Sequence, residues 1–345
     1  MSRLRRSDCS LPGFRRRRRG RGFEYLGPDG VRLTDEETLA RIRSLAIPPA
    51  WEDVWICMDP WGHLQAVGTD AAGRKQYLYH ERWRTRRDQA KFEHMLDFAR
   101  ALPSLRRDVA RGLRQPEPTR DRVLAGAVRL LDRGFFRIGS EAYAEQNESY
   151  GLATLLKRHA RVRGPTVVFD YAAKGGARRI QELKDPDVAR LVRVLKRRRG
   201  GSPELLAYRN GRRWVDVKAA DVNEFIKETT GDDFTAKDFR TWNATLLAAV
   251  ALAVAEEPGT KTARTRAITS AVKTVAGYLG NTPAVCRSAY IDPRVFDRFR
   301  AGGTIREAVS GLGSIDLEDV SALQGAVEEA VIDLLDGTPA EARAA

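Results

Sequence analysis

The sequence has few of the residues that build disulfide, metal or redox sites. Its three cysteines (Cys9, Cys57 and Cys286) lie far apart and form no CxxC pair, so neither a disulfide framework nor a zinc site is indicated. The four histidines form no HExxH pattern, and neither a phosphate-binding P-loop nor a dinucleotide-binding glycine fingerprint occurs. We therefore expect chemistry that uses no metal, nucleotide or redox cofactor.

Long apolar segments are also missing. No apolar run approaches the ~18 residues of a transmembrane helix, and the basic N-terminus is not followed by the apolar stretch of a secretory signal. We therefore expect a cytoplasmic protein with no membrane partner. At 345 residues and 42% hydrophobic content, the chain is long enough for two domains with their own cores.

The charge is strongly unbalanced. Lysine and arginine number 60 against 46 acidic residues, a net charge of +14. This excess suits a polyanionic partner, and nucleic acid is favoured over a membrane surface because no basic amphipathic helix stands out. A merely soluble basic protein remains the alternative on charge alone. Residues 307–336 contain eight acidic residues and no Lys or Arg, so we expect them to face away from DNA and close the C-terminal domain.

The pattern along the chain predicts three regions and an α+β fold. Residues 1–22 carry the run Arg15–Arg19 between glycines, which predicts a disordered basic arm that either follows phosphates or is simply solvated. Residues 23–90 combine short strand-like runs with one helix and predict a small β-sheet domain. Residues 91–345 are mainly helical, with helices expected at about 81–100 and 104–114 at the junction.

Four short segments concentrate chemically useful side chains. In residues 277–293 an apolar helical stripe ends at Gly280, Asn281 follows at once, and Tyr290 comes nine residues later. The other segments are Phe136–Tyr143 (FRIGSEAY), Phe169–Gly175 (FDYAAKG), and Lys237–Trp242 (KDFRTW) at the start of a helix. The segment Phe169–Gly175 is β-rich and runs into Lys174, Gly175 and Gly176, which predicts a hairpin turn.

These segments resemble the catalytic motifs of the type IB DNA topoisomerases, in particular the small poxvirus-like bacterial branch. The resemblance spans roughly residues 30–300. It implies five catalytic positions, in the order of that family: Arg137, Lys174, Arg240, Asn281 and Tyr290. It also implies a larger, mainly α-helical catalytic domain with a β-hairpin, in the fold that these enzymes share with tyrosine recombinases.

The implied chemistry is consistent with the properties of these side chains. A tyrosine has a pKa near ~10, so nearby cations would favour the attacking phenolate and neutralise the phosphate. By the resemblance, Tyr290 is the nucleophile and Arg137, Arg240 and Asn281 bind the non-bridging phosphate oxygens. Lys174 is the expected general acid for the leaving 5′-oxygen. The product is a 3′-phosphotyrosyl DNA, and religation needs no ATP.

The first domain carries part of the same resemblance. Residues 73–80 (GRKQYLYH) resemble the strand that the family places in the DNA major groove. The expected DNA-contacting residues are Arg74, Lys75, Gln76, Tyr77, Tyr79 and Tyr143. Ser140 stands where poxvirus members carry a base-reading lysine, so their sequence preference for a pentamer is in doubt here.

The predicted function is therefore relaxation of supercoiled duplex DNA by a monomeric, C-shaped clamp on the nucleoid. Two alternatives remain open. A tyrosine recombinase would use the same nucleophile, but recombinases usually carry His-x-x-Arg where this chain has Lys237-Asp-Phe-Arg240. A non-enzymatic DNA-packaging protein would explain the charge but not the five positions.

Overall fold

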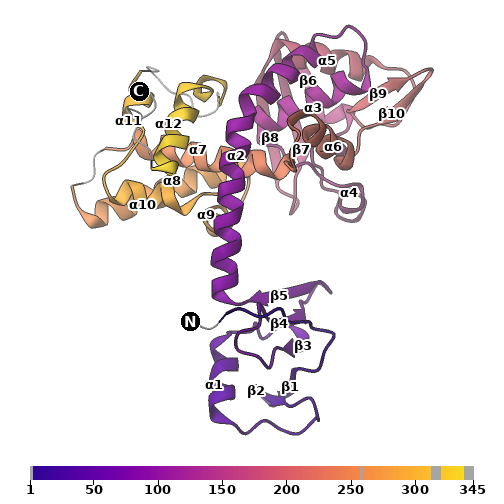
Figure 1. Cartoon of the computed structure of the whole chain (residues 1–345). Helices are drawn as coiled ribbons and strands as arrows, with labels where there is room; N and C mark the ends of the chain where they lie inside the picture. Colours follow the sequence, from indigo (N-terminus) through magenta and orange to yellow (C-terminus); the bar gives the residue numbers. More distant parts are fainter. Residues whose placement is uncertain (1–2, 257–258, 312–319, 338–345) are drawn as a thin grey trace. The chain divides into compact units, whose positions relative to one another are not determined.

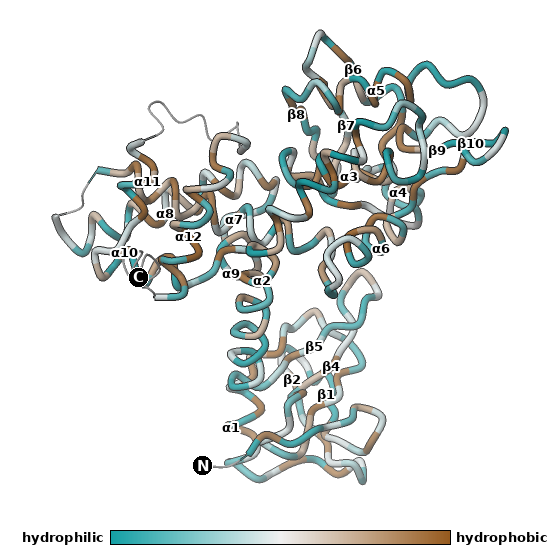
Figure 2. The backbone as a smooth tube through the Cα atoms, turned by 45° about the horizontal axis from the view of Figure 1, so that its top comes forward, coloured by the Kyte–Doolittle hydropathy of each residue, from teal (hydrophilic) through white to brown (hydrophobic). Residues whose placement is uncertain are grey.

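The computed structural model describes residues 3–256, 259–311 and 320–337, and the chain divides into two compact units, Met1–Glu93 and His94–Ala345 (Figure 1). The first unit contains a five-stranded sheet and one short helix. The second is mainly helical, with a three-stranded and a two-stranded sheet. The predicted α+β fold class is confirmed. In the described ranges, no helix is both long and apolar enough to span a membrane (Figure 2).

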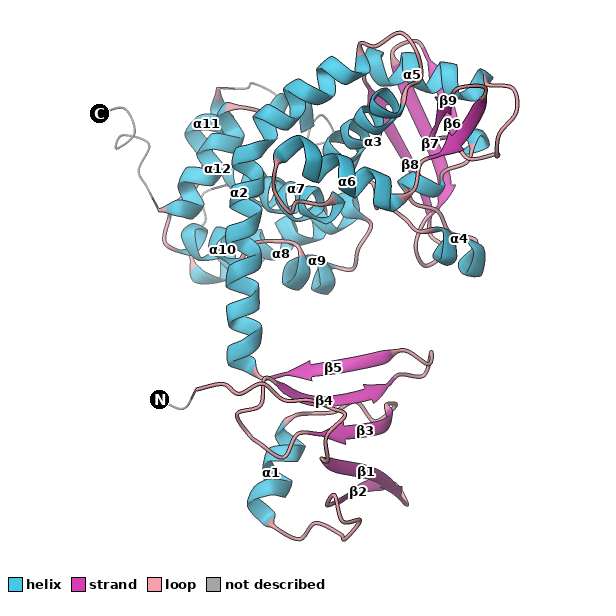
Figure 3. Ribbon diagram, turned by 45° about the vertical axis from the view of Figure 1, so that its right-hand side comes forward, coloured by secondary structure: helices cyan, strands magenta, loops and turns pink. Residues whose placement is uncertain are grey.

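The first unit is built on an antiparallel sheet with the strand order β2-β1-β3-β4-β5 (Figure 3). Its strands are β1 (Phe14–Arg19), β2 (Gly22–Leu26), β3 (Glu52–Ile56), β4 (Leu64–Thr69) and β5 (Lys75–Tyr79). Helix α1 (Glu36–Ser44) covers one face, where its Ile42 packs against Val54 and Ile56. Asp35 caps this helix by accepting a hydrogen bond from the Thr38 amide.

The prediction of a disordered arm over residues 1–22 is wrong, because β1 lies inside the sheet between β2 and β3. Phe14 packs into the core under α1. Arg16 donates hydrogen bonds to the carbonyl oxygens of Ile47, Pro48 and Trp51, and its guanidinium carbon lies 4.2 Å from the ring centroid of Phe23. Composition indicated a solvated chain, but backbone pairing on both sides and these contacts hold the strand in place.

Helix α2 (Glu81–Leu113) is one continuous helix, so the expected separate segments at 81–100 and 104–114 are wrong. Pro103 lies within it. Its neighbours Leu102 and Leu105 are fully buried, as is Phe98 a turn earlier. Burial of this apolar face outweighs the hydrogen bond that proline removes from the helix.

The second unit adds eleven helices of α or 3₁₀ type before residue 312, and two after the undescribed segment 312–319. The helices to residue 230 are α3 (Arg120–Gly134), α4 (Glu141–Asn147), η1 (Leu152–Thr154), η2 (Lys157–His159), α5 (Pro186–Arg197) and α6 (Ala219–Thr230). The later ones are α7 (Ala236–Ala253), α8 (Lys261–Leu279), α9 (Pro283–Ala289), α10 (Pro293–Arg300), α11 (Arg306–Ser310), η3 (Val320–Leu323) and α12 (Ala326–Asp336). The sheets are β6-β7-β8 (Ala160–Arg163, Thr166–Ala172, Arg178–Lys184) and β10-β9 (Arg213–Asp216, Ala207–Asn210).

Helix α7 is the centre of this unit, since it is buried on nearly every side and packs against α3, α6, α8, α10, α11 and α12. Its Trp242 donates from Nε1 to Glu328 of α12 over 3.0 Å. The guanidinium of Arg106 in α2 binds both Glu328 and Asp132 of α3. One buried ionic network therefore joins four helices, and α12 also packs against α10 and α11.

Candidate active site

Lys174 lies in the turn of a β-hairpin, as predicted. Strands β7 and β8 pair in an antiparallel register from Thr166↔Lys184 to Ala172↔Arg178. The turn between them is closed by hydrogen bonds from the Ala173 amide to the Ala177 carbonyl (2.8 Å) and from Gly176 to Ala173 (3.0 Å). The hairpin therefore presents Lys174 at its tip, away from the core formed by Phe169 and Tyr171.

Arg137 is positioned by backbone contacts after the end of α3. Phe136 anchors the segment in the core, packing edge-on against Phe169 with ring centroids 5.0 Å apart. The Leu152 amide donates to the Arg137 carbonyl over 2.8 Å. The two chain segments that contain Gly139 and Gly151 cross beside this hydrogen bond. A Cβ added to Gly139 would lie 2.8 Å from the Cα of Gly151, and a Cβ added to Gly151 would lie 2.5 Å from the Cα of Gly139. This close backbone approach fixes the path of the chain around Arg137.

Arg240 lies in the first turns of α7, on a helix whose start is set by a capping box between Thr235 and Asp238. The side chain is 6% exposed. Its Nη1 donates to the Phe135 carbonyl and its Nη2 to the Leu279 carbonyl, each over 2.9 Å. These two bonds lock the plane of the guanidinium within the protein.

The C-terminal end of α8 places Asn281 in the same site. Gly280 has the left-handed conformation (φ 63°, ψ 49°), and the Asn281 amide donates to the Ala276 carbonyl over 3.0 Å. The Asn281 side-chain oxygen then accepts a hydrogen bond from Arg137. The predicted apolar stripe and glycine C-cap of this helix are therefore both present.

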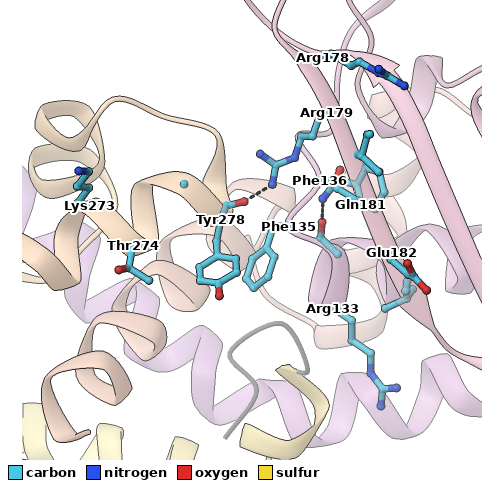
Figure 4. Close-up of a pocket in the computed structure, with 14 residues that line it drawn as sticks. Arg133, Phe135, Phe136, Arg178, Arg179, Gln181, Glu182, Lys273, Thr274 and Tyr278 are labelled. Atoms are coloured by element: carbon cyan, nitrogen blue, oxygen red, sulfur yellow. Dashed lines mark hydrogen bonds between the residues drawn. The ribbon is translucent and has the colours of Figure 1, made fainter. Parts of the chain in front are cut away.

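Three consecutive carbonyls at this helix end each accept a hydrogen bond from a different arginine. Arg179 of β8 donates to Tyr278, Arg240 to Leu279 and Arg137 to Gly280, the last over 2.8 Å. Figure 4 shows Arg179 reaching from its strand to the Tyr278 carbonyl. The negative end of a helix dipole is thus surrounded by three positive side chains.

Tyr290 follows the short helix α9 and is held by its backbone. Its amide donates to the Cys286 carbonyl over 3.1 Å. The buried Thr245 hydroxyl of α7 lies 3.3 Å from the Tyr290 carbonyl and accepts from the Asp292 amide over 3.1 Å. The half-buried Tyr290 ring faces Arg240, whose guanidinium carbon lies 5.2 Å from the ring centroid. The central helix thereby positions both the cation and the tyrosine.

The five predicted catalytic positions meet in this one region. Arg137, Lys174, Arg240 and Tyr290 all line a cleft of about 320 Å³, and Asn281 joins them through its bond to Arg137. Lys237 and Tyr150 also line this cleft. A neighbouring hollow of about 200 Å³ is lined by Arg137, Lys174 and Arg179. The arrangement offers an anionic group several cations and one hydroxyl at close range.

The electrostatics of the site favour an incoming anion. Burial, together with the positive charge of Arg137, lowers the pKa of Arg240 to about 10, while Tyr290 opposes this effect. Burial also lowers the pKa of Arg179. Within the described residues, no hydrogen-bond partner reaches Arg240 Nε or Asn281 Nδ2, although both atoms are buried. Two donors with unused capacity therefore lie among crowded positive charges.

Arg179 was not identified from the sequence. It lies five residues after Lys174, directly across the hairpin from the inward-facing Tyr171. Its inward direction follows from the strand register, which the sequence alone does not determine. The alternation of apolar residues in β7 was the available signal, since a hairpin partner of Tyr171 must share its face.

The predicted DNA-contacting residues fall into two groups. Lys75, Tyr77 and Tyr79 are exposed on β5, and the two tyrosine rings are stacked with centroids 6.2 Å apart. Arg74 and Gln76 instead bind the Asp70 carboxylate, and Gln76 alternates to the other face of the strand. Tyr143 belongs to α4, but its side chain lies outside the described part of the structure. Within the described ranges, no three His, Cys, Asp or Glu side chains gather as metal ligands.

Two protein-family models match this chain. Residues 80–301 match the family described as eukaryotic DNA topoisomerase I, catalytic core. Residues 22–70 match the family described as bacterial DNA topoisomerase IB, N-terminal domain.

Individual relatives give the same result. DNA topoisomerase 1B of Acanthamoeba polyphaga mimivirus is 31% identical over 291 residues, covering 81% of this chain and 85% of the viral protein. DNA topoisomerase 1B of vaccinia virus (strain Copenhagen) is 22% identical over 74% of this chain and 80% of its own length. DNA topoisomerase 1 of Mycosarcoma maydis is 25% identical over 50% of this chain but only 19% of its own. The chain belongs to the type IB DNA topoisomerase family.

Proposed function

We propose that this protein relaxes supercoiled duplex DNA by transient cleavage of one strand, acting as a monomer without metal or ATP. The observation that carries the proposal is the placement of Tyr290 beside the Arg240 guanidinium, in a cleft that Arg137 and Lys174 also line. A cation at this distance stabilises the phenolate that attacks phosphorus. The phenol proton passes to water, a bond forms from Tyr290 Oη to phosphorus, and the bond from phosphorus to the 5′-oxygen breaks.

Three side chains bind the phosphate in this mechanism. Arg137 and Arg240 are held by backbone carbonyls, and each guanidinium keeps further N–H groups that can donate to the non-bridging oxygens. Asn281 adds its Nδ2 donor, which has no hydrogen-bond partner among the described residues. Because these groups are already fixed, little reorganisation is needed when negative charge builds in the transition state.

Lys174 supplies the proton for the leaving 5′-oxygen. Its position at the tip of the β7–β8 hairpin supports this role, since Arg137 and Lys174 line both hollows of the site. Arg179 acts as a positioning residue that binds the end of α8, from which Asn281 and the Tyr290 segment continue. In religation the 5′-hydroxyl attacks phosphorus, the tyrosine leaves, and Lys174 takes back its proton. Rotation of the free end between the two steps removes supercoils.

Relaxation of plasmid DNA tests the proposal. Both negatively and positively supercoiled plasmids should relax in EDTA without ATP, and Tyr290→Phe should bind DNA but neither relax it nor form a covalent adduct. A strict requirement for Mg²⁺ or ATP would overturn the proposal, as would an adduct formed by Tyr290→Phe. Exchange of strands between two duplexes without relaxation would identify a recombinase instead.

A further inference from the structure

The arginine run Arg15–Arg19 forms a strand that the function proposed above does not use. This strand, β1, pairs with β2 over Arg15–Arg19 and with β3 at Phe14 and Arg15. The matched N-terminal family covers residues 22–70, so β1 lies outside it. A strand of five consecutive arginines is costly to keep in a sheet, because like charges on neighbouring positions repel one another.

The strand register shows which face each arginine occupies. One row of directly paired residues crosses the sheet on the side of α1: Phe14, Ile56, Ala66 and Leu78. The next row lies on the opposite face: Arg15, Trp55, Val67 and Tyr77. Since side chains alternate along a strand, Arg17 and Arg19 share the face of Arg15.

The same alternation places Lys75 and Tyr79 on the face of Tyr77. This face therefore has two exposed regions, one with arginines on β1, next to the edge strand β2, and one with tyrosines and a lysine on the other edge strand, β5. Its centre is covered by the chain that precedes β1, where Cys9 packs on Trp55 and Val67. The Trp55 Nε1 also donates to the Leu11 carbonyl over 2.9 Å.

Charge on β1 is only partly balanced within the protein. Glu24 of β2 binds Arg17 over 2.6 Å and lies 3.6 Å from Arg19. The hydrogen bond from Arg17 lowers the pKa of this carboxyl. One carboxylate thus contacts two of the three guanidinium groups on this side of the strand. Arg16, on the other side, is used internally by its three bonds to carbonyls, so the arginines differ in their roles.

We propose that Arg15, Arg17 and Arg19 bind the phosphate backbone of duplex DNA, extending the surface of β5. The proposal rests on the function proposed above, and it takes β5 to enter a major groove, as the resemblance of residues 73–80 implies. Three strand spacings of about 4.8 Å separate β5 from β1, or ~14 Å. A major groove is ~12 Å wide, so β1 meets the backbone that borders the groove. Such contacts strengthen binding and carry no sequence preference.

The experiment measures the affinity of full-length protein for a short fluorescent duplex across a salt series, in the Tyr290→Phe background so that no cleavage occurs. The test variant is Arg15→Gln with Arg17→Gln. The matched control is Arg18→Gln with Arg43→Gln, which removes equal charge from two exposed residues, Arg18 on the alternate side of β1 and Arg43 on α1. Thermal unfolding checks that each variant folds.

Each phosphate contact contributes about 0.9 to the slope of log affinity against log salt. The slope should therefore decrease by up to ~1.8 in the test variant and by much less in the control. Equal slopes in the two variants, changed or unchanged, would overturn the proposal. Cleavage by the same variants with Tyr290 restored is assayed separately at saturating DNA. Absence of cleavage by the parent protein would contradict the proposed function, whereas the slope comparison would still decide the role of β1.

Discussion

Replacing Gly280 by alanine should disturb the site through one defined contact. Gly280 has φ +63°, and a Cβ there would lie 2.3 Å from Nη1 of Arg179. No real methyl group tolerates such a distance, so the guanidinium must move. It would then lose its hydrogen bond to the Tyr278 carbonyl, and the helix end that carries Asn281 would shift.

The cost has two separable parts. A left-handed conformation costs a non-glycine residue ~1–2 kcal/mol, and loss of a hydrogen bond from a charged donor costs ~1.5–3 kcal/mol. The free energy of unfolding of Gly280→Ala should therefore fall by ~2.5–5 kcal/mol. A displacement of the phosphate-binding groups by about 1 Å can lower the cleavage rate by ~10²-fold, which sets the scale expected for single-turnover cleavage.

A double-mutant cycle with Arg179→Ala separates the two parts. In the Arg179→Ala background the methyl group meets no guanidinium, so Gly280→Ala should cost only the backbone strain, and the coupling energy should be at least ~1.5 kcal/mol. Gly277→Ala is the matched control, because it lies in the same helix with open space around its Cβ and should be neutral or slightly stabilising. If Gly280→Ala costs the same with and without Arg179, the contact is not the cause.

Three further predictions address other groups. Lys174→Ala should cleave ordinary DNA very slowly. It should recover most of its cleavage rate when sulfur replaces the bridging 5′-oxygen, because the sulfur leaves without protonation by an acid. Equally slow cleavage of both substrates would show that Lys174 is not the general acid. Arg240→Ala should lower single-turnover cleavage ~10²–10³-fold and recover less on the sulfur substrate, since the non-bridging oxygens still need neutralising; full recovery would contradict its role. Burial, with Asp216 and Glu141, raises the pKa of Glu204 to about 7 from 4.5, so its charge destabilises the fold increasingly as pH rises through this range. Glu204→Gln should thus increase the free energy of unfolding near pH ~8 by about 1 kcal/mol after solvent screening, and by less near pH ~5, as urea denaturation at both values would test.

The sequence predicted those parts of the molecule that depend on local pattern. The Gly280 cap, the hairpin at Lys174 and the helix that carries Arg240 are encoded by nearby residues, and the motifs placed all five expected catalytic positions in one region. Arg179 could not be found in this way. Its partner is a backbone carbonyl about a hundred residues later in the chain, and backbone groups leave no mark in a sequence motif.

The arginine run Arg15–Arg19 was predicted to be disordered, but the chain forms a strand there. Its composition is typical of solvated chain, yet pairing with β2 and β3 is a property of the backbone and is independent of side-chain charge. What holds Arg16 inside is a set of carbonyls around residues 47–51, which only the folded sheet brings within reach. Contacts between segments that are distant in the sequence therefore explain both why Arg179 was not identified and why β1 was not predicted.

The crossing of Gly139 and Gly151 has a consequence for how related sequences should be compared. Each glycine leaves space that the backbone of the other fills, so a methyl group at either position would overlap the main chain. Substituting both together would not relieve the overlap, because neither change makes room for the other. A substitution at one of these glycines can therefore not be compensated by a second substitution at the other. Strict invariance of these two positions among relatives would record the geometry of a chain crossing, and would be misread if taken as contact with DNA.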